Sequence, residues 1–226
     1  MKYIQVKNLS KSYSDIDALK DLSMDIDAGI LFGILGPNGA GKSTLIKILA
    51  TLVEPDSGEV FINNINLIKN PRKIRELIGY VAQDIALDKI LTGRELLNFQ
   101  SDLYHMKKKE KYERIKTLIN QLEMNDWIDR KCGTYSGGMK RRIDLAAGLL
   151  HLPKVLILDE PTVGLDIESR NIIWQLLKDL KNDGMTIILS SHYLDEIDKL
   201  ADSLVIIDDG KVIAQGTPAQ LKNKLG

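Results

Sequence analysis

The sequence predicts an α/β domain with a central, mainly parallel sheet, an N-terminal antiparallel β portion and an inserted helical subdomain. Three observations support this fold class. Five short runs are almost continuously apolar, as strands buried in a parallel sheet are; they cover residues 31–35, 78–81, 155–158, 186–190 and 203–208. Residues 1–6 alternate like a short strand, and residues 83–150 show helical periodicity without strong strands.

The first buried run leads directly into a phosphate-binding loop. Residues 36–43 read Gly-Pro-Asn-Gly-Ala-Gly-Lys-Ser, which fits G-x-x-x-x-G-K-[ST], and a helical segment follows. The glycines let backbone N–H groups face phosphates, Lys42 supplies charge for the β and γ groups, and the Ser43 hydroxyl is a Mg²⁺ ligand. We therefore predict a P-loop NTPase core that binds nucleotide through Gly36, Pro37, Asn38, Gly39, Ala40, Gly41, Lys42, Ser43 and Thr44.

After the strand at 78–81, the pattern of apolar residues changes from continuous runs to helical spacing, and this change indicates how the chain is organised. Apolar residues recur at helical spacing through Leu96, Leu97 and Leu103, and again through Ile115 and Leu118. We predict a single domain over residues 1–226. Residues 1–82 and 151–226 form its nucleotide-binding core lobe, and residues 83–150 form a helical lobe.

An acidic pair follows the third buried run. Asp159 comes directly after residues 155–158, where a carboxylate reaches a Mg²⁺ ion beside the phosphates, and Glu160 is a candidate general base for water. Taken alone, an Asp-Glu pair before Pro161 is more often a solvated turn. Downstream of a phosphate-binding loop, we expect Asp159 to be a metal ligand and Glu160 a catalytic residue.

A second anion site is predicted at residues 135–139, which read Tyr-Ser-Gly-Gly-Met. At a helix N-terminus this turn presents a hydroxyl, free N–H groups and a positive dipole end. With this order of motifs, the chain resembles the nucleotide-binding subunits of ATP-binding cassette (ABC) transporters over nearly its whole length. Their signature is usually Leu-Ser-Gly-Gly-Gln, so Tyr135 here replaces Leu and Met139 replaces Gln.

The resemblance implies that one nucleotide is shared between two copies of the chain or between the chain and a homologue. Ser136, Gly137 and Gly138 would bind the γ-phosphate of ATP held by the opposite subunit. Asp166, in the family's D-loop, would lie at the seam between the subunits. Without the resemblance, Asp166 is simply a helix N-cap before Ile167.

Three further positions take roles from the resemblance alone. Gln83 matches the Q-loop glutamine, which touches Mg²⁺ or the attacking water and marks the hinge to the helical lobe. His192 matches the switch histidine at the γ-phosphate, and Tyr13 matches the aromatic residue that stacks on adenine. By themselves, these would be a surface glutamine, a structural histidine and an exposed hairpin tyrosine.

The implied activity is ATP hydrolysis with Lys42, Gln83, Glu160 and His192 as catalytic residues, and with ATP and Mg²⁺ as cofactors. Mg²⁺ would be held by Ser43, Gln83 and Asp159. The resemblance also implies an integral membrane partner, encoded separately, and ATP-driven dimerisation. The segment 135–142 and residues 91–95 are most similar to the drug- and antibiotic-export branch, the daunorubicin-resistance type.

Composition limits the other function classes. Lys and Arg together number 31, as do Asp and Glu, so net charge gives no reason to expect nucleic-acid binding. We expect the basic clusters at residues 107–111 and 140–142 to be solvated faces, and the single cysteine, Cys132, to be structural. The longest aliphatic runs are strand-sized. We therefore expect a cytoplasmic protein, peripheral on the inner face of the membrane.

Two other classes remain open from the sequence. One is a soluble ABC ATPase that acts in assembly, repair or translation without transport. The absence of a long heptad insertion argues against the repair type, and the single cassette argues against the translation type. The other is a P-loop kinase that does not dimerise, which would leave Ser136 and His192 unexplained.

Overall fold

The computed structural model describes residues 2–225, so Met1, the first residue of the predicted N-terminal strand, lies outside it. Its centre is a six-stranded sheet, parallel except for one antiparallel edge strand. In spatial order the strands are β10 (Lys211–Gly216), β9 (Ser203–Asp208), β3 (Leu31–Leu35), β8 (Thr186–Ser191), β7 (Val155–Asp159) and β6 (Ile78–Val81). The five predicted buried strands are confirmed, with β7 and β8 each one residue longer than expected.

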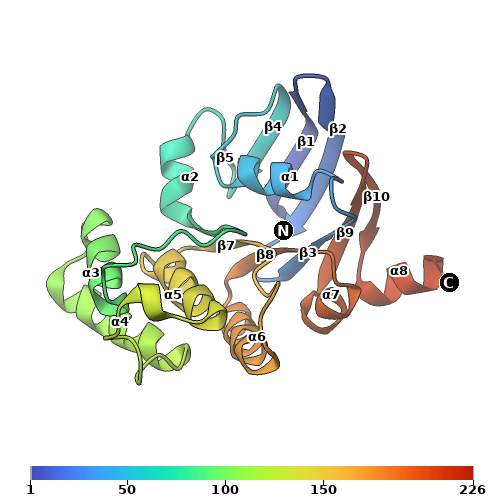
Figure 1. Ribbon diagram of the computed structural model, residues 1–226. Coiled ribbons are helices and arrows are strands. Elements are labelled where there is room, and N and C mark those ends of the chain that lie inside the picture. The colour runs from blue at the N-terminus through green and yellow to red at the C-terminus, as the bar shows by residue number, and fades with distance from the viewer. Residues whose placement is uncertain (1, 226) are drawn as a thin grey trace.

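The predicted N-terminal antiparallel portion is a second, four-stranded sheet. Its order is β2 (Ile16–Asp27), β1 (Lys2–Tyr13), β4 (Ser57–Ile62) and β5 (Ile65–Asn66). A tight hairpin joins β1 to β2, with Tyr13 opposite Ile16. Figure 1 shows this sheet above the central one, with α1 (Lys42–Leu49) between them.

The two faces of the central sheet belong to different hydrophobic clusters. Because side chains alternate along a strand, Phe32 and Ile34 point to the cluster shared with α1 and the antiparallel sheet, whereas Leu31 points to the opposite cluster. The opposite face is covered by α5 (Gly137–Leu149), α6 (Ile167–Asn182) and α7 (Leu194–Leu200) (Figure 1). The chain ends with α8 (Pro218–Leu225), and α2 (Pro71–Leu77) precedes β6.

Residues 83–150 contain helices and a single isolated β-bridge. In order they hold α3 (Gly93–Leu103), α4 (Lys108–Gln121), a 3₁₀ turn (Cys132–Thr134) and α5. The apolar stripe of α4, including Ile115 and Leu118, is buried in the same cluster as α5 and the strands. The helical part therefore packs on the core through a continuous apolar interior. Within residues 2–225, no helix combines the length and apolar content needed to cross a membrane.

This packing makes Leu118 a test of the helical part. Leu118 is fully buried, so Leu118→Ala should lower the free energy of unfolding by about 2–5 kcal/mol through lost burial and the cavity left behind. Lys116→Ala, on the exposed side of α4, is the matched control and should change it by less than about 0.5 kcal/mol. Urea unfolding of both variants measures the difference. Equal stabilities would contradict the packing described.

Candidate functional site

The phosphate-binding loop connects β3 to α1 and is shaped by close backbone approaches. Gly41, the N-cap of α1, has φ 102°, and a Cβ there would lie 2.4 Å from the Ala18 carbonyl oxygen. A Cβ on Gly36 would lie 2.1 Å from the Ile207 carbonyl oxygen. Only glycine fits either position. The loop therefore enters α1 with its backbone N–H groups at the helix's positive end, which favours an anion.

Lys42 is the first residue of α1, and its side chain is buried. Its ammonium donates hydrogen bonds to the carbonyl oxygens of Gly36 (2.8 Å) and Pro37 (3.0 Å). It also lies 3.9 Å from Glu160 Oε1. Burial of the Lys42 charge is thus compensated by two carbonyl oxygens of the loop and by the Glu160 carboxylate.

Asp159 ends β7, where its register partner on β8 is Ser190. Its Oδ1 accepts hydrogen bonds from Ser190 Oγ at 2.6 Å and from Ser43 Oγ at 3.3 Å. The carboxylate is 2% exposed, so these hydroxyls supply the partners that a buried charge requires. The parallel strands bring Ser43 and Asp159 together although the residues are 116 positions apart.

Glu160 is held in an unusual backbone conformation. It has φ 47°, a region that residues other than glycine seldom occupy, and it is only 7% exposed. Its N–H donates to Ser190 Oγ at 3.0 Å. Its carboxylate accepts from Gln83 Nε2 at 3.3 Å and lies 3.1 Å from His192 Nδ1. Such strain in a buried acid is typical of a functional position.

The phosphate loop, Glu160, Gln83 and His192 line one cavity of about 530 Å³, and the buried Asp159 and Ser190 are not among its lining residues. Its lining residues Asn38, Glu160 and His192 follow the carboxyl ends of β3, β7 and β8, the edge at which open α/β sheets bind ligands. Its lining comprises Ile16, Ala18, Asn38, Gly39, Gly41, Lys42, Ser43, Thr44, Gln83, Glu160, Val163 and His192. The structure therefore brings together the phosphate loop and all four predicted catalytic residues.

The predicted second anion site lies elsewhere. Among residues 2–225, the lining of this cavity includes none of Ser136, Gly137, Gly138 and Asp166. Ser136 caps α5, accepting from the Met139 N–H at 3.2 Å, and is exposed together with Gly137. Both residues are therefore accessible to an anion brought by another molecule.

Asp166 lies beside this turn and caps α6. It accepts hydrogen bonds from the Ser169 N–H (2.7 Å) and hydroxyl (2.9 Å), and these bonds lower the pKa of the Asp166 carboxyl. A Cβ on Gly138 would lie 2.0 Å from Ser169 Oγ. The N-termini of α5 and α6 are thus packed together, and the predicted N-cap role of Asp166 is confirmed.

Tyr13 is not among the residues that surround the cavity. It is 44% exposed at the end of β1, with the Lys11 ammonium 5.6 Å from its ring centroid. The cavity wall nearest this hairpin is formed by Ile16 and Ala18. Stacking of adenine on Tyr13 therefore stays a prediction.

Two residues of the site were missed by the sequence analysis. The Ser190 hydroxyl donates to Asp159 and accepts from the Glu160 N–H. In the sequence, only its position at the end of an apolar strand could have indicated this role. Arg141 was expected on a solvated face, and this is wrong: it is 3% exposed and donates to the carbonyl oxygens of Ala82 (2.6 Å) and Gln83 (2.7 Å).

The surroundings of Arg141 are unusual for a charged residue. Desolvation lowers the pKa of Arg141 and raises the pKa of neighbouring Asp144 to about 6. The two side chains form an ion pair at 3.5 Å. Arg141 therefore links α5 to the backbone at Gln83, which leads into the helical part.

The oxygen donors of the site suit Mg²⁺. Ser43 Oγ and Asp159 Oδ1, 3.3 Å apart, are a hydroxyl and a carboxylate next to the phosphate loop. Mg²⁺ prefers oxygen ligands and is commonly bound by one or two protein groups together with phosphates and water. The residues present fit that ion, and Gln83, which also lines the cavity, donates a hydrogen bond to Glu160.

Comparisons with known proteins agree with this geometry. A family model described as "ABC transporter" matches residues 19–163, and one described as "AAA domain, putative AbiEii toxin, Type IV TA system" matches residues 129–198. The daunorubicin/doxorubicin resistance ATP-binding protein DrrA of Streptomyces peucetius is 43% identical over 99% of this chain and 68% of its own length.

Solved structures are also similar. The cassette cbiO1 from Clostridium perfringens, described as part of an ABC transporter complex, has a TM-score of 0.89 and 32% identity over 99% of this chain and 92% of its own. A cassette solved as a dimer in a post-hydrolysis state with ADP and Pi has a TM-score of 0.86 and 30% identity. That match covers 95% of this chain and 98% of the other.

Ser190 provides a test of the site. Ser190→Ala removes the donor to Asp159 and leaves the Glu160 N–H without its acceptor, so we expect nucleotide-hydrolysis kcat to fall about 10–100-fold, as for other groups that orient ligands. Ser203→Ala, at the start of β9, is the control. Steady-state phosphate release and circular dichroism separate lost activity from lost folding. A folded Ser190→Ala variant with unchanged kcat would remove Ser190 from the site.

Proposed function

The chain belongs to the ABC transporter family, and on that basis we propose that it powers export of a drug or antibiotic through a separate membrane subunit. It is an ATP-binding subunit of an ABC transporter that hydrolyses ATP to drive transport. The resistance function in the name of the Streptomyces peucetius relative supports the export direction. The observation that carries the proposal is one cavity lined by the phosphate loop, Glu160, Gln83 and His192, with Ser136 exposed outside it.

Hydrolysis would use the buried acid as its base. Glu160 lies within reach of Lys42, Gln83 and His192, so a water beside the γ-phosphate can lose its proton to Glu160. Lys42, the loop N–H groups and His192 then stabilise charge on the transferring group. Because the Glu160 carboxylate already has these partners, its orientation is set before nucleotide arrives.

Mg²⁺ would be held by Ser43 and Asp159, with Gln83 as a further oxygen donor. When bound, this ion supplies positive charge to the phosphate oxygens. The residues of the chain position it: the Ser190 hydroxyl orients Asp159, and α1 carries Ser43 directly after Lys42. Asp159 is therefore assigned to metal binding and Glu160 to proton transfer.

Because the second anion site lies outside the nucleotide cavity, we infer a site that is shared between two subunits. Ser136 and Gly137 are exposed, and neither lines the nucleotide cavity of its own subunit. We propose that they close on the γ-phosphate of ATP bound by a second copy or a homologue, with Asp166 at the seam. Two subunits in this arrangement bind two nucleotides. Hydrolysis removes the γ-phosphates that hold the two subunits together.

Residues 83–150 would transmit this closure as a helical lobe on a core lobe of 1–82 and 151–226. Arg141 supports this division because it binds the backbone at Ala82 and Gln83, where the proposed lobes meet. The membrane subunit would contact the protein from the inner face of the cell membrane. A soluble ABC ATPase of assembly or repair is the alternative class.

Dimerisation tests the shared site. Glu160→Gln should slow hydrolysis by about 10²–10⁴-fold and so trap an ATP-dependent dimer, measured by analytical ultracentrifugation. Adding Ser136→Ala should weaken that dimer about tenfold through loss of a charge-assisted hydrogen bond. Adding Ser57→Ala, at an exposed position on β4, should leave it unchanged. A Glu160→Gln protein that binds ATP but stays monomeric would exclude the shared-site model.

The membrane partner is tested separately. The tagged chain, purified from detergent-solubilised native cells, should retain a polytopic membrane protein in stoichiometric amount, identified by mass spectrometry. The Glu160→Gln variant with ATP should retain it as well. Recovery of a soluble partner, with no membrane protein in mild detergent, would instead favour an assembly or repair ATPase.

A further inference from the structure

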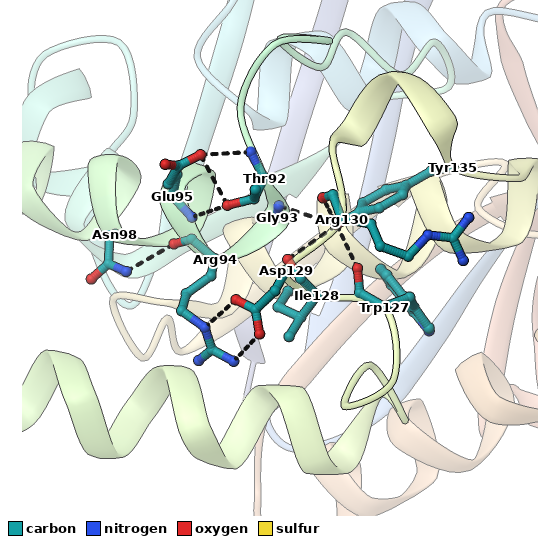
Figure 2. Close-up of polar contacts among 10 residues, drawn as sticks. All are labelled: Thr92, Gly93, Arg94, Glu95, Asn98, Trp127, Ile128, Asp129, Arg130 and Tyr135. Atoms are coloured by element: carbon teal, nitrogen blue, oxygen red, sulfur yellow. Dashed lines mark hydrogen bonds and ion pairs between the residues drawn. The ribbon is translucent and has the colours of Figure 1, made fainter.

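Tyr135, the residue before Ser136, makes contacts that the family's usual leucine cannot make. Its side chain is buried at 5% exposure, and its hydroxyl accepts a hydrogen bond from the Gly93 N–H at 3.1 Å. The carbonyl oxygens of Trp127, Ile128 and Arg130 lie 3.3, 3.3 and 3.1 Å from the same oxygen. One hydroxyl proton serves these three acceptors. Figure 2 shows the phenol pointing between the Gly93 nitrogen and the 127–130 turn.

The Gly93 N–H needs such a partner because it belongs to the first turn of α3, where intrahelical acceptors are missing. Thr92 and Glu95 form a capping box at the same end. Because the Thr92 hydroxyl binds the Glu95 N–H, the Gly93 N–H relies on Tyr135. A residue of the signature turn thus completes the N-terminus of another helix.

Backbone contacts join the same two segments. The Cys132 N–H donates to the Leu91 carbonyl at 2.8 Å, and the Gly133 N–H donates to the Lys89 carbonyl at 3.1 Å. At the other end, the Arg94 guanidinium binds Asp129 with two hydrogen bonds, at 2.6 and 3.0 Å (Figure 2). The Tyr135 hydroxyl lies within this junction, and Ser136 is the next residue along the chain.

Gly93 and the Tyr135 hydroxyl also constrain each other sterically. A Cβ on Gly93 would lie 2.5 Å from the phenolic oxygen and 2.8 Å from Ile128 Cδ1. The Ile128 methyl is the end of a flexible side chain, whereas the phenol is held by its ring packing edge-on against Trp127, with centroids 4.9 Å apart. The Ile128 carbonyl oxygen, 3.2 Å away, adds a smaller restriction, so the hydroxyl is the closest obstacle to a side chain at position 93.

We propose that Tyr135 is a positioning residue that ties Ser136, through the Gly93 N–H, to the segment following Gln83, so that both move as one unit. Motion of residues 84–93 then carries the second anion site toward or away from the opposite nucleotide. The proposal rests on the proposed shared site. It assigns Tyr135 no contact with nucleotide.

The opposing explanation is that Tyr135 only fills space. Tyr135→Phe separates the two, because it keeps the ring and removes the hydroxyl. Burial raises the pKa of Tyr135 to about 12, so the hydroxyl keeps its proton at neutral pH and no ionisation complicates the comparison. Tyr112→Phe is the matched control: Tyr112 lies on α4 and is 65% exposed.

The first experiment measures ATP-driven dimerisation in the full-length Glu160→Gln protein, together with ADP affinity. Tyr135→Phe should weaken dimerisation about 5- to 10-fold, the loss expected for one buried hydrogen bond, and leave the ADP Kd within about twofold of the parent. Tyr112→Phe should change neither quantity.

Two other results would overturn the inference, and they differ in meaning. If the Tyr135→Phe variant dimerises with ATP like its parent, the hydroxyl does not position Ser136, and a lower Tm would then show only that the hydroxyl stabilises the fold. If the Glu160→Gln parent itself does not dimerise with ATP, the shared-site function fails and the inference fails with it.

The second experiment is a double-mutant cycle on unfolding. In the protein with Tyr135, Gly93→Ala should strongly raise the equilibrium constant for unfolding. In the protein that carries Tyr135→Phe, the increase caused by Gly93→Ala should be at least about fivefold smaller. A Gly93→Ala protein that folds only together with Tyr135→Phe leads to the same conclusion. Additive effects would show that the hydroxyl does not restrict position 93 and would overturn the proposed link.

Discussion

Two carboxylates, Asp159 and Glu160, are almost completely buried at the end of one strand, and the rest of the site depends on compensating them. Burying such groups is costly unless each has hydrogen-bonding or charged partners. The partners come from different parts of the chain: Ser43 from α1, Ser190 from β8, and His192 from the segment after it. Only the strand order β3, β8, β7, β6 brings these segments to one edge of the sheet.

The two faces of that sheet perform different tasks. One face packs on α1 and the antiparallel sheet, which hold the phosphate loop against the strand ends. The other face packs on α6, on the helices after Gln83 and on α5. The exposed signature turn begins α5. Because the interior is close-packed on both faces, a displacement of α5 is transmitted to its neighbours. Arg141 on α5 provides one such contact, because its guanidinium donates a hydrogen bond to the Gln83 carbonyl oxygen.

The site is divided between a cavity with buried chemistry and a turn with exposed hydrogen-bond donors. In the cavity, Glu160 is oriented before any ligand binds. At the turn, the Ser136 hydroxyl caps α5 by accepting the Met139 N–H, and the preceding residue, Tyr135, binds the N-terminus of α3. In the proposed shared site, a turn held by these contacts would lose little conformational entropy on binding a partner's phosphate.

The sequence by itself determined the local features. The phosphate loop, the strand that precedes it and the acid at the end of β7 could be located because a contiguous motif or an apolar run specifies each of them. Strands β2, β4, β5 and β10 were not located individually, because short or partly exposed strands lack the continuous apolar signal. Only the tertiary structure decided that Ser190 binds Asp159, that Arg141 is buried and that Tyr135 reaches Gly93. Each is a contact between residues far apart along the chain, and its geometry depends on how strands and helices pack, which no local pattern encodes.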